Sequence, residues 1–328
     1  MALTMSPPSA PVAGWDHVPV LAEAVVSVLG AAPAGTYVDC TLGLGGHAAL
    51  LLEAHPGLRL LGLDQDAEAL EQAAAALARF GDRVALRHAR SDALPEVLSE
   101  LGIDDVTAVL ADLGVSSPQV DRAERGFSYR SDRDGPLDMR MDRSRGRTAA
   151  DLLADLDEDA LVRALRQLGD EPHARRIARA VVDAEPRTTA QLAAVVRDAV
   201  PAARRRSGDP AKRVFQTLRI LVNDELGTLD RTLDVAMAAL VPGGRLAVIS
   251  FHSLEDRMVK TRFRAAAEDG CTCPPGLPCA CGFEPTVRLL RRKPWVADPA
   301  EVAANPRSTS ARLRAVEALP PPGGEDRP

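Results

Sequence analysis

The chain has 328 residues, a hydrophobic content of 46% and a formal net charge of −6, which allow one large domain or a domain with a sizeable insertion. No apolar run approaches the roughly 20 residues of a membrane span. The N-terminus lacks the basic region and apolar stretch of a signal peptide. We therefore expect a cytoplasmic protein.

The charge is unevenly distributed. Residues 1–112 contain 5 basic and 15 acidic residues, whereas residues 113–214 contain 20 and 17. The acidic first part suits a cationic cofactor, and the arginine-rich middle part suits a polyanion. This distribution excludes a general nucleic-acid coat protein, because sequence-independent electrostatic attraction would be weak. A nucleic-acid substrate would have to be recognised by its shape in a defined context.

The most informative stretch is residues 36–47, Thr-Tyr-Val-Asp-Cys-Thr-Leu-Gly-Leu-Gly-Gly-His. It predicts a short strand that ends in Asp39, a glycine loop, and a helix that continues to residue 54. Gly43, Gly45 and Gly46 allow a ligand to approach the backbone closely, and a helix N-terminus at this point offers free N–H groups.

A second apolar strand, Leu58–Asp64, ends in an acid that can accept hydrogen bonds from both hydroxyls of a ribose. Two nucleoside cofactors fit this pattern. Residues 43–48 satisfy G-x-G-x-x-A, which is typical of a dinucleotide site. S-adenosylmethionine (SAM) has no pyrophosphate, and its α-ammonium and sulfonium charges suit the carboxylate of Asp39 before the loop. A glycine turn without a ligand is a third interpretation.

Strands that alternate with helices in the first third predict a parallel sheet with right-handed crossovers. The expected strands of this part are Tyr37–Asp39, Leu58–Asp64, Val84–His88 and Val106–Asp112. The expected helices include Val20–Leu29 and Ala67–Arg79. The chain then lacks periodicity from Gly114 to Arg147, and it becomes helical from Ala149 to about Val200, with interruptions at Pro172 and Pro186.

A basic linker at residues 201–210 precedes a long amphipathic helix, Val214–Leu240, and a turn at Pro242-Gly243-Gly244. The sheet is expected to resume with Arg245–Ser250, Thr286–Leu290 and Ala311–Glu317. We therefore expect the first part of an α/β core at 1–114, a mainly helical insertion at 115–210, the second part of the core at 211–319, and a disordered tail at 320–328.

In open α/β sheets, ligands bind beyond the carboxyl ends of the strands. Four expected strand ends would meet there, and they carry Asp39, Asp64, Arg90-Ser91-Asp92 and Asp112. The loop after Asp112 suits a methyl acceptor, because an exocyclic amine reacts when acceptors orient its NH2 group and free its lone pair. Ser116 and Ser117 are candidate acceptors, although a plain serine turn before a helix explains either one equally well.

Four cysteines, Cys271, Cys273, Cys279 and Cys281, form C-x-C-x5-C-x-C in a loop rich in proline and glycine. Four thiolates could hold a tetrahedral zinc ion, although the usual C-x2-C pair is missing. A reduced loop without metal is an equal alternative, and disulfides are the least favoured one in a cytoplasmic protein.

Six motifs closely resemble those of one family. They are Gly43-Leu44-Gly45-Gly46-His47, Asp112-Leu113-Gly114-Val115-Ser116-Ser117-Pro118-Gln119, Arg125-Gly126-Phe127-Ser128, Asp134-Gly135-Pro136-Leu137-Asp138-Met139-Arg140-Met141-Asp142, Ser250-Phe251-His252-Ser253-Leu254-Glu255-Asp256-Arg257 and Asn305-Pro306-Arg307-Ser308. The family is ribosomal RNA small subunit methyltransferase H, also called MraW. The resemblance runs from His17 to about Glu317, but the cysteine loop and the proline-rich ends depart from the family pattern.

The resemblance implies SAM-dependent methylation of the N4 of a cytidine in 16S rRNA, at the decoding centre near the P site, in an assembling or assembled small subunit. It implies an α/β class I SAM-dependent methyltransferase fold, with a Rossmann-like, mostly parallel sheet and an inserted helical domain for substrate recognition. By motif match, the cofactor contacts fall on Gly45, Gly46, His47, Asp64, Asp112 and Gln119. A further contact falls near Ser91, where some members carry an aromatic residue, and a serine cannot stack on adenine.

An RNA substrate gives possible roles to further residues. Phosphates could be held by Arg133, Arg140, Arg143, Arg145 and Arg147, although such a run is usually a solvated face. Phe127 or Tyr129 could stack on an extruded base, or either could be a core residue. His252 is a candidate general base, but the amine needs no deprotonation before attack, so a structural hydrogen bond suits it better.

Two other functions also fit the sequence. A nicotinamide-dependent dehydrogenase would explain the G-x-G-x-x-A pattern. A non-catalytic ribosome-assembly factor could bind SAM as a structural ligand.

Overall fold

The computed structural model describes residues 19–201, 208–269 and 281–321. Its centre is a seven-stranded sheet with the strand order β3-β2-β1-β4-β5-β7-β6. The strands are β1 (Gly35–Asp39), β2 (Leu58–Asp64), β3 (Val84–His88), β4 (Val106–Asp112), β5 (Leu240–Ser250), β6 (Val287–Leu289) and β7 (Arg312–Ala318). Strands β1 to β5 pair in parallel, whereas β7 is antiparallel to both β5 and β6. The predicted α/β architecture with a mostly parallel sheet is thereby confirmed.

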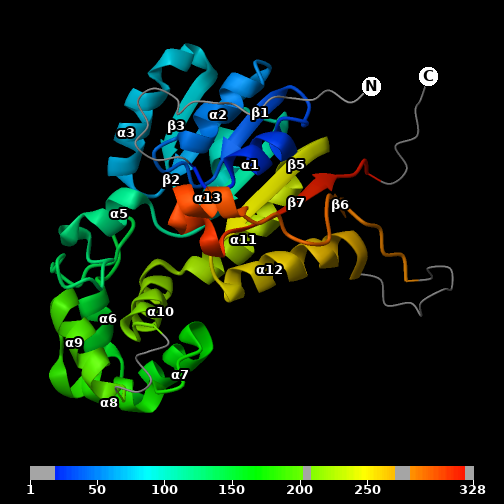
Figure 1. Ribbon diagram of the computed structural model, residues 1–328. Coiled ribbons are helices and arrows are strands. Elements are labelled where there is room, and N and C mark those ends of the chain that lie inside the picture. The colour runs from blue at the N-terminus through cyan, green and yellow to red at the C-terminus, as the bar shows by residue number, and fades with distance from the viewer. Residues whose placement is uncertain (1–18, 202–207, 270–280, 322–328) are drawn as a thin grey trace, which may run out of the picture.

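Two groups of helices accompany the sheet (Figure 1). Those around the sheet are α1 (Ala22–Leu29), α2 (Gly46–Ala54), α3 (Ala67–Leu77), α4 (Leu94–Leu101), α11 (Glu225–Ala239), α12 (Ser253–Arg264) and α13 (Pro299–Ala304). Those of the middle region are α5 (Ser117–Asp121), α6 (Ala149–Asp155), α7 (Glu158–Gly169), α8 (Ala174–Ala184), α9 (Thr189–Ala199) and α10 (Ala211–Asn223). None of the helices in the described ranges combines the length and the apolar character needed to cross a membrane.

Short 3-10 helices lie at η1 (Ala78–Arg83), η2 (Ser91–Ala93), η3 (Ala123–Arg125) and η6 (Pro306–Ser310). A π-helical turn, η5 (Ala265–Asp269), extends α12.

The sheet is buried on both faces, which explains its continuous apolar strands. Successive side chains of a strand point to opposite faces. In β4, Ala108 and Leu110 accordingly belong to the core formed with α1 and α2, whereas Val109 and Ala111 belong to the core formed with α4, α11 and α12. This double burial fixes the strands, and it leaves their carboxyl ends as the place for polar side chains.

A separate hydrophobic core lies within α6 to α10, and Figure 1 shows these helices grouped beside the sheet. Leu165 of α7, Ile177 of α8, Val196 of α9 and Leu218 of α10 are buried together in it. Interruptions occur near Pro172 and Pro186, as predicted, and a further one separates α6 from α7 at Leu156 and Asp157. The boundaries of the insertion at 115 and 210 stay a prediction. Most of the basic linker and of the C-terminal tail lies outside the described residues.

Two predicted elements differ from the structure. The expected helix Val214–Leu240 is divided at Asp224, whose φ of 49° is left-handed, a conformation that aspartate adopts more readily than most residues. The expected turn Pro242-Gly243-Gly244 lies inside β5. There Val106 pairs with Leu240 and Ala108 pairs with Arg245, so the extra residues form a bulge in the strand.

Candidate functional site

A cavity of about 1140 Å³ lies beyond the carboxyl ends of the parallel strands. Most of the predicted cofactor and acceptor residues line it, namely Gly46, His47, Asp64, Ser91, Asp112, Ser116, Ser117 and Gln119. Gly45 is not a lining residue. It is the N-cap of α2 with a φ of 81°, and a Cβ atom there would lie 2.9 Å from Cδ1 of Leu77. Gly45 therefore lets the loop pack closely against α3, and the cofactor contact predicted for it stays a prediction.

Asp64 ties the glycine loop to the end of β2. Its Oδ2 accepts a hydrogen bond from the N–H of Gly43 at 2.7 Å, and its Oδ1 accepts one from the N–H of Asp66 at 2.9 Å. Burial raises the pKa of Asp64 to about 6, although both backbone amides lower it. Because the N–H of Gly43 is already bound to a carboxylate, this part of the loop is poorly suited to cradle a pyrophosphate.

The carboxylate of Asp39 does not reach the cavity, which corrects the role we expected for it. Asp39 is 2% exposed, and it accepts hydrogen bonds from the Tyr37 hydroxyl at 2.8 Å and from the N–H of Thr41 at 3.2 Å. Burial raises its pKa to about 6. Asp39 therefore supports the loop from within the protein. The strand-end carboxylates that line the cavity are those of Asp64 and Asp112, at the ends of β2 and β4 on either side of β1.

Several buried polar atoms of the lining residues have no hydrogen-bond partner among the described residues. They are Nδ1 and Nε2 of His47, Oδ1 of Asp112 and Oγ of Ser116. The Nε2 of His47 lies 3.5 Å from Oδ2 of Asp112, without hydrogen-bond geometry. Unpaired buried polar atoms are costly, and so rare in folded proteins. Their concentration here fits a polar, positively charged ligand that would satisfy them.

The two candidate serines have different surroundings. The Ser117 hydroxyl contacts the Arg307 guanidinium, which also lies 3.6 Å from Oδ2 of Asp121. The Ser116 hydroxyl is buried and unpartnered, while its N–H donates to Oε1 of Gln119 at 3.0 Å. Of the two serines, Ser116 is therefore the one whose hydroxyl has no partner among the described residues, whereas the Ser117 hydroxyl already accepts from Arg307.

Gln119 and Ser91 have protein partners in addition to facing the cavity. Nε2 of Gln119 donates to Oδ2 of Asp66 at 2.8 Å, and the Ser91 hydroxyl bonds to Oγ1 of Thr232 at 2.7 Å. Oδ2 of Asp66 also accepts a hydrogen bond from Nη1 of Arg125 at 2.7 Å. The Arg125 side chain is only 2% exposed. The sequence reasoning missed this buried network, although Arg125 begins one of the family motifs.

The aromatic residues of the cavity differ in part from those we expected. Tyr129 lines it, together with Phe251 from the end of β5 and Trp295 from the segment before α13. Phe127 is buried in the core of the helical region and does not line the cavity. On the same side, Oε1 of Glu301 in α13 accepts the N–H of Leu21 at 2.6 Å, so the C-terminal segment closes one wall.

The five arginines expected to clamp phosphates each lie within 4 Å of a carboxylate. The pairs are Arg133–Asp121, Arg140–Asp138, Arg143–Glu68, Arg145–Asp142 and Arg147–Asp155. Their role in RNA binding stays a prediction, and their charges are largely balanced within the protein. Cys271, Cys273 and Cys279 lie outside the described residues, and Cys281 is exposed.

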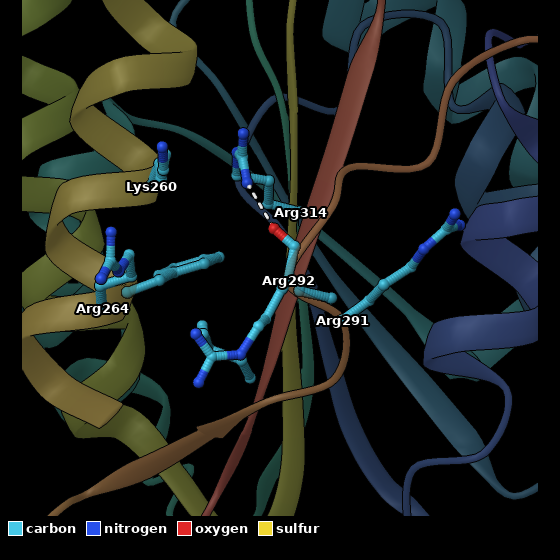
Figure 2. A pocket seen from close by; sticks show the side chains of 8 residues that line it. Lys260, Arg264, Arg291, Arg292 and Arg314 are labelled. Atoms are coloured by element: carbon cyan, nitrogen blue, oxygen red, sulfur yellow. Dashed lines mark hydrogen bonds between the residues drawn. The ribbon is translucent and has the colours of Figure 1, made fainter. Parts of the chain in front are cut away.

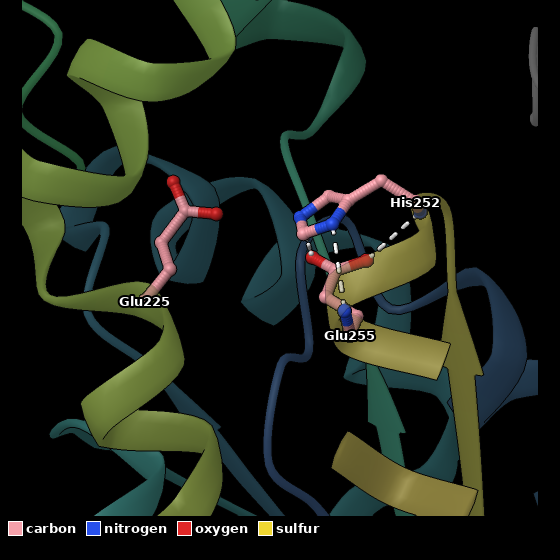
Figure 3. Close-up of side chains that lie close together, drawn as sticks. All are labelled: Glu225, His252 and Glu255. Atoms are coloured by element: carbon pink, nitrogen blue, oxygen red, sulfur yellow. Dashed lines mark hydrogen bonds and ion pairs between the residues drawn. The ribbon is translucent and has the colours of Figure 1, made fainter. Parts of the chain in front are cut away.

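His252 does not line the cavity, and its contacts are structural. It caps α12: its Nδ1 accepts the N–H of Glu255 at 3.4 Å, and its Nε2 lies 3.0 Å from Oε1 of Glu255. Figure 3 shows Glu225 of α11 facing this pair, and the possible metal-ligand atoms of the three residues lie within 4.8 Å of one another. Arg219 already binds both oxygens of Glu225, at 2.8 and 2.9 Å. Because this guanidinium supplies the positive charge, we assign no metal to the group.

The chain is similar to known proteins over almost its whole length. Residues 14–319 match the MraW methylase family. The ribosomal RNA small subunit methyltransferase H of Symbiobacterium thermophilum is 51% identical over 312 residues, which cover 93% of this chain and 97% of the relative. The proteins of the same name from Thermobifida fusca and Kineococcus radiotolerans are 52% and 53% identical, over 92% and 95% of this chain and 93% and 80% of their own.

This match extends across the helical region as well as both parts of the sheet. Together with the strand order, it confirms the class I SAM-dependent methyltransferase fold that the motifs implied. The chain belongs to the MraW methylase family.

Proposed function

We propose that this chain transfers a methyl group from SAM to the exocyclic N4 of a cytidine in 16S rRNA, at the decoding centre near the P site. Family membership supports methyl transfer with SAM as cofactor, and the names of the relatives support small-subunit rRNA as substrate. The observation that carries the proposal is the group of unpartnered buried atoms on His47, Asp112 and Ser116 at one wall of the cavity.

The residues of the cavity suit the cofactor chemically. Bound SAM supplies an electrophilic methyl group on a positively charged sulfur. We assign the ribose hydroxyls to the carboxylate of Asp64, which retains acceptor capacity beside its two backbone donors. We assign polar contacts of the cofactor to His47 and Asp112, and the remaining contacts to Gly45, Gly46, Ser91 and Gln119.

Ser116 is the acceptor we assign to the target amine. A hydroxyl oxygen has two lone pairs, and Oγ of Ser116 has no hydrogen-bond partner among the described residues. Accepting an N–H of the amine withdraws the nitrogen lone pair from conjugation with the ring and orients it for attack. The rate gain comes from positioning and fixed dipoles, so no strong base is needed before methyl transfer.

The size and lining of the cavity support an extruded base as substrate. A volume of about 1140 Å³ exceeds that of most single-ligand pockets, which is about 300–1000 Å³, and so leaves room for a base beside the cofactor. Tyr129, Phe251 and Trp295 offer faces on which a flipped pyrimidine could stack. We propose that the helical insertion recognises the surrounding rRNA, in an assembling or assembled small subunit.

The test is methyl transfer with a position-specific readout. Purified protein and SAM with a labelled methyl group are incubated with small subunits, and with protein-free 16S rRNA, from a strain that lacks the corresponding gene. We expect label in one cytidine, identified as N4-methylcytidine by mass mapping of nucleosides. Ser116→Ala should lower kcat and leave SAM affinity unchanged, whereas Asp112→Ala should weaken SAM binding by about 1–3 kcal/mol.

Other outcomes would decide against the proposal. Methylation at C5 or at a ribose would overturn the assigned acceptor. Tight SAM binding without transfer to either substrate would favour a non-catalytic assembly factor. Thermal stabilisation by NAD but not by SAM would favour a dehydrogenase.

A further inference from the structure

A second, smaller cavity of about 130 Å³ lies between α12 and the strands β6 and β7 (Figure 2). It shares no lining residue with the cofactor cavity. Its described lining residues are Lys260, Phe263, Arg264, Leu289, Arg291, Arg292, Arg314 and Ala315. Five of these eight carry a positive charge and none is acidic, in a chain whose net charge is −6.

Arg314 and Arg292 each have a carboxylate partner. Arg314 is buried against Asp256, with Nε 2.7 Å from Oδ1, and Figure 2 shows it also donating to the backbone oxygen of Arg292. The side chain of Arg292 lies 2.8 Å from Oε1 of Glu268, an ion pair open to solvent and therefore weak. Lys260, in contrast, is exposed, and no carboxylate of the described residues lies within 4 Å of its ammonium group.

The positive surface continues beyond the cavity. Arg257 lies one turn before Lys260 on α12, and Lys293 follows Arg292 in the chain. Both are exposed, and in the described part of the protein neither has a carboxylate within 4 Å. We call Arg257, Lys260, Arg264, Arg291, Arg292 and Lys293 the basic surface.

Arg291 connects the basic surface to the cofactor cavity. In Figure 2 its side chain points away from Lys260 and Arg264. Its guanidinium carbon lies 5.4 Å from the ring centroid of Trp295, and Trp295 lines the cofactor cavity. The segment from Arg291 to Trp295 therefore runs from the smaller cavity to the cofactor cavity, and the next residue, Val296, is exposed.

We infer that the basic surface binds the sugar–phosphate backbone that flanks the target base. The inference rests on the proposed function, since a base held in the cofactor cavity leaves its neighbouring nucleotides at the rim. Lysine and arginine contacts to phosphates fix the register of a nucleic acid without reading its sequence. Proteins that bind single-stranded RNA combine a cationic groove with aromatic side chains on which bases stack, and here Trp295 lies at the rim beside Arg291. An acidic protein segment would match the charge but not this aromatic rim.

The test compares two variants. One lacks three positive charges of the basic surface, and the other lacks three positive charges at the opposite edge of the sheet. The first variant is Lys260→Gln/Arg291→Gln/Lys293→Gln. The control is Arg59→Gln/Arg79→Gln/Arg87→Gln, whose side chains lie on or beside β2 and β3 and are accessible to solvent. Both variants lower the net charge equally. Binding to protein-free 16S rRNA is measured over a salt series, with KM, kcat and SAM affinity measured separately.

We expect the first variant to bind RNA about tenfold more weakly, and the slope of log affinity against log salt to fall by about 2, because each lost phosphate contact removes roughly 0.7. Its KM for RNA should rise, while kcat and SAM affinity stay unchanged. The control should behave like the wild type.

Two results would overturn the inference, and a third would refute the proposed function. Equal RNA binding by the two variants would overturn the inference. A defect seen with assembled subunits but absent with protein-free RNA would assign the basic surface to a ribosomal protein and would also overturn it. A wild type that binds RNA without methylating it would refute the proposed function alone, because the binding assay tests the basic surface without turnover.

Discussion

At the scale of single residues, burial decides which polar groups of the crevice serve the fold and which serve a ligand. Asp39 and Asp64 both end strands and both have pKa values raised to about 6 by burial. Asp39 is enclosed by Tyr37 and Thr41, whereas Asp64 lines the cavity. A pH dependence of ligand binding should therefore arise from Asp64.

We predict that SAM affinity is constant above about pH 6 and falls as the pH drops below it. The free protein binds a proton at Asp64 near pH 6, and the protonated carboxyl loses the negative charge that favours a hydroxyl donor and a cationic ligand. The Kd should then rise by up to about tenfold per pH unit below that point. Titration calorimetry between pH 5 and 8 measures this. Asp64→Asn should bind weakly and independently of pH, and a flat profile in the wild type would contradict the assignment.

At the scale of elements, the junction of β1 and α2 depends on close packing of the glycine loop against α3. Gly45 has a φ of 81°, and a Cβ atom there would come within 2.9 Å of Leu77. Gly102, at the end of α4, has a similar left-handed φ of 63° but has no atom within 4 Å of the corresponding position. Comparing the same substitution at the two glycines therefore separates the cost of backbone strain from the cost of steric overlap.

We predict that Gly102→Ala lowers the free energy of unfolding by about 1–2 kcal/mol, the cost of a left-handed alanine. Gly45→Ala should lower it by a further 1–3 kcal/mol, roughly the cost of overpacking, because Leu77 has to move. Urea unfolding without ligand measures both. If the two substitutions had equal effects, Leu77 and α3 would move without a cost in the free energy of unfolding, and this contact would not hold the loop.

The elements themselves were predictable to different degrees. Apolar runs located the strands: β2, β3 and β4 have the predicted bounds, and β2 and β4 end in the acids Asp64 and Asp112. The division of the long helix at Asp224 was not predicted, because no glycine or proline stands at this position. In the structure Asp224 faces Arg231 of α11 and, from a distant part of the chain, Arg90 at 3.7 Å. The motifs located the crevice, but they could not tell that Asp39 turns toward Tyr37 while Asp112 faces the cavity.

At the scale of the whole molecule, a buried cation joins the sheet to the segment that leads into the helical region. Nη1 of Arg125 donates to Asp66, and its Nη2 donates to the backbone oxygens of Arg140 and Met141 at 3.2 and 3.0 Å. In the sequence Arg125 resembles the exposed arginines around it, and its carboxylate partner lies 59 residues away. Long-range pairing of this kind cannot be read from local pattern.

We predict that Arg125→Met destabilises the protein by about 3–5 kcal/mol, because it leaves the Asp66 carboxylate buried without its cation. The matched control is Arg143→Met, since Arg143 is exposed and lies 3.8 Å from Glu68, a solvent-screened pair worth about 0–1 kcal/mol. Hydrogen exchange should rise in residues 126–148 of Arg125→Met, where the anchoring bonds are lost, more than in β1 to β4. If the two variants were equally stable, Arg125 would not couple the helical region to the sheet.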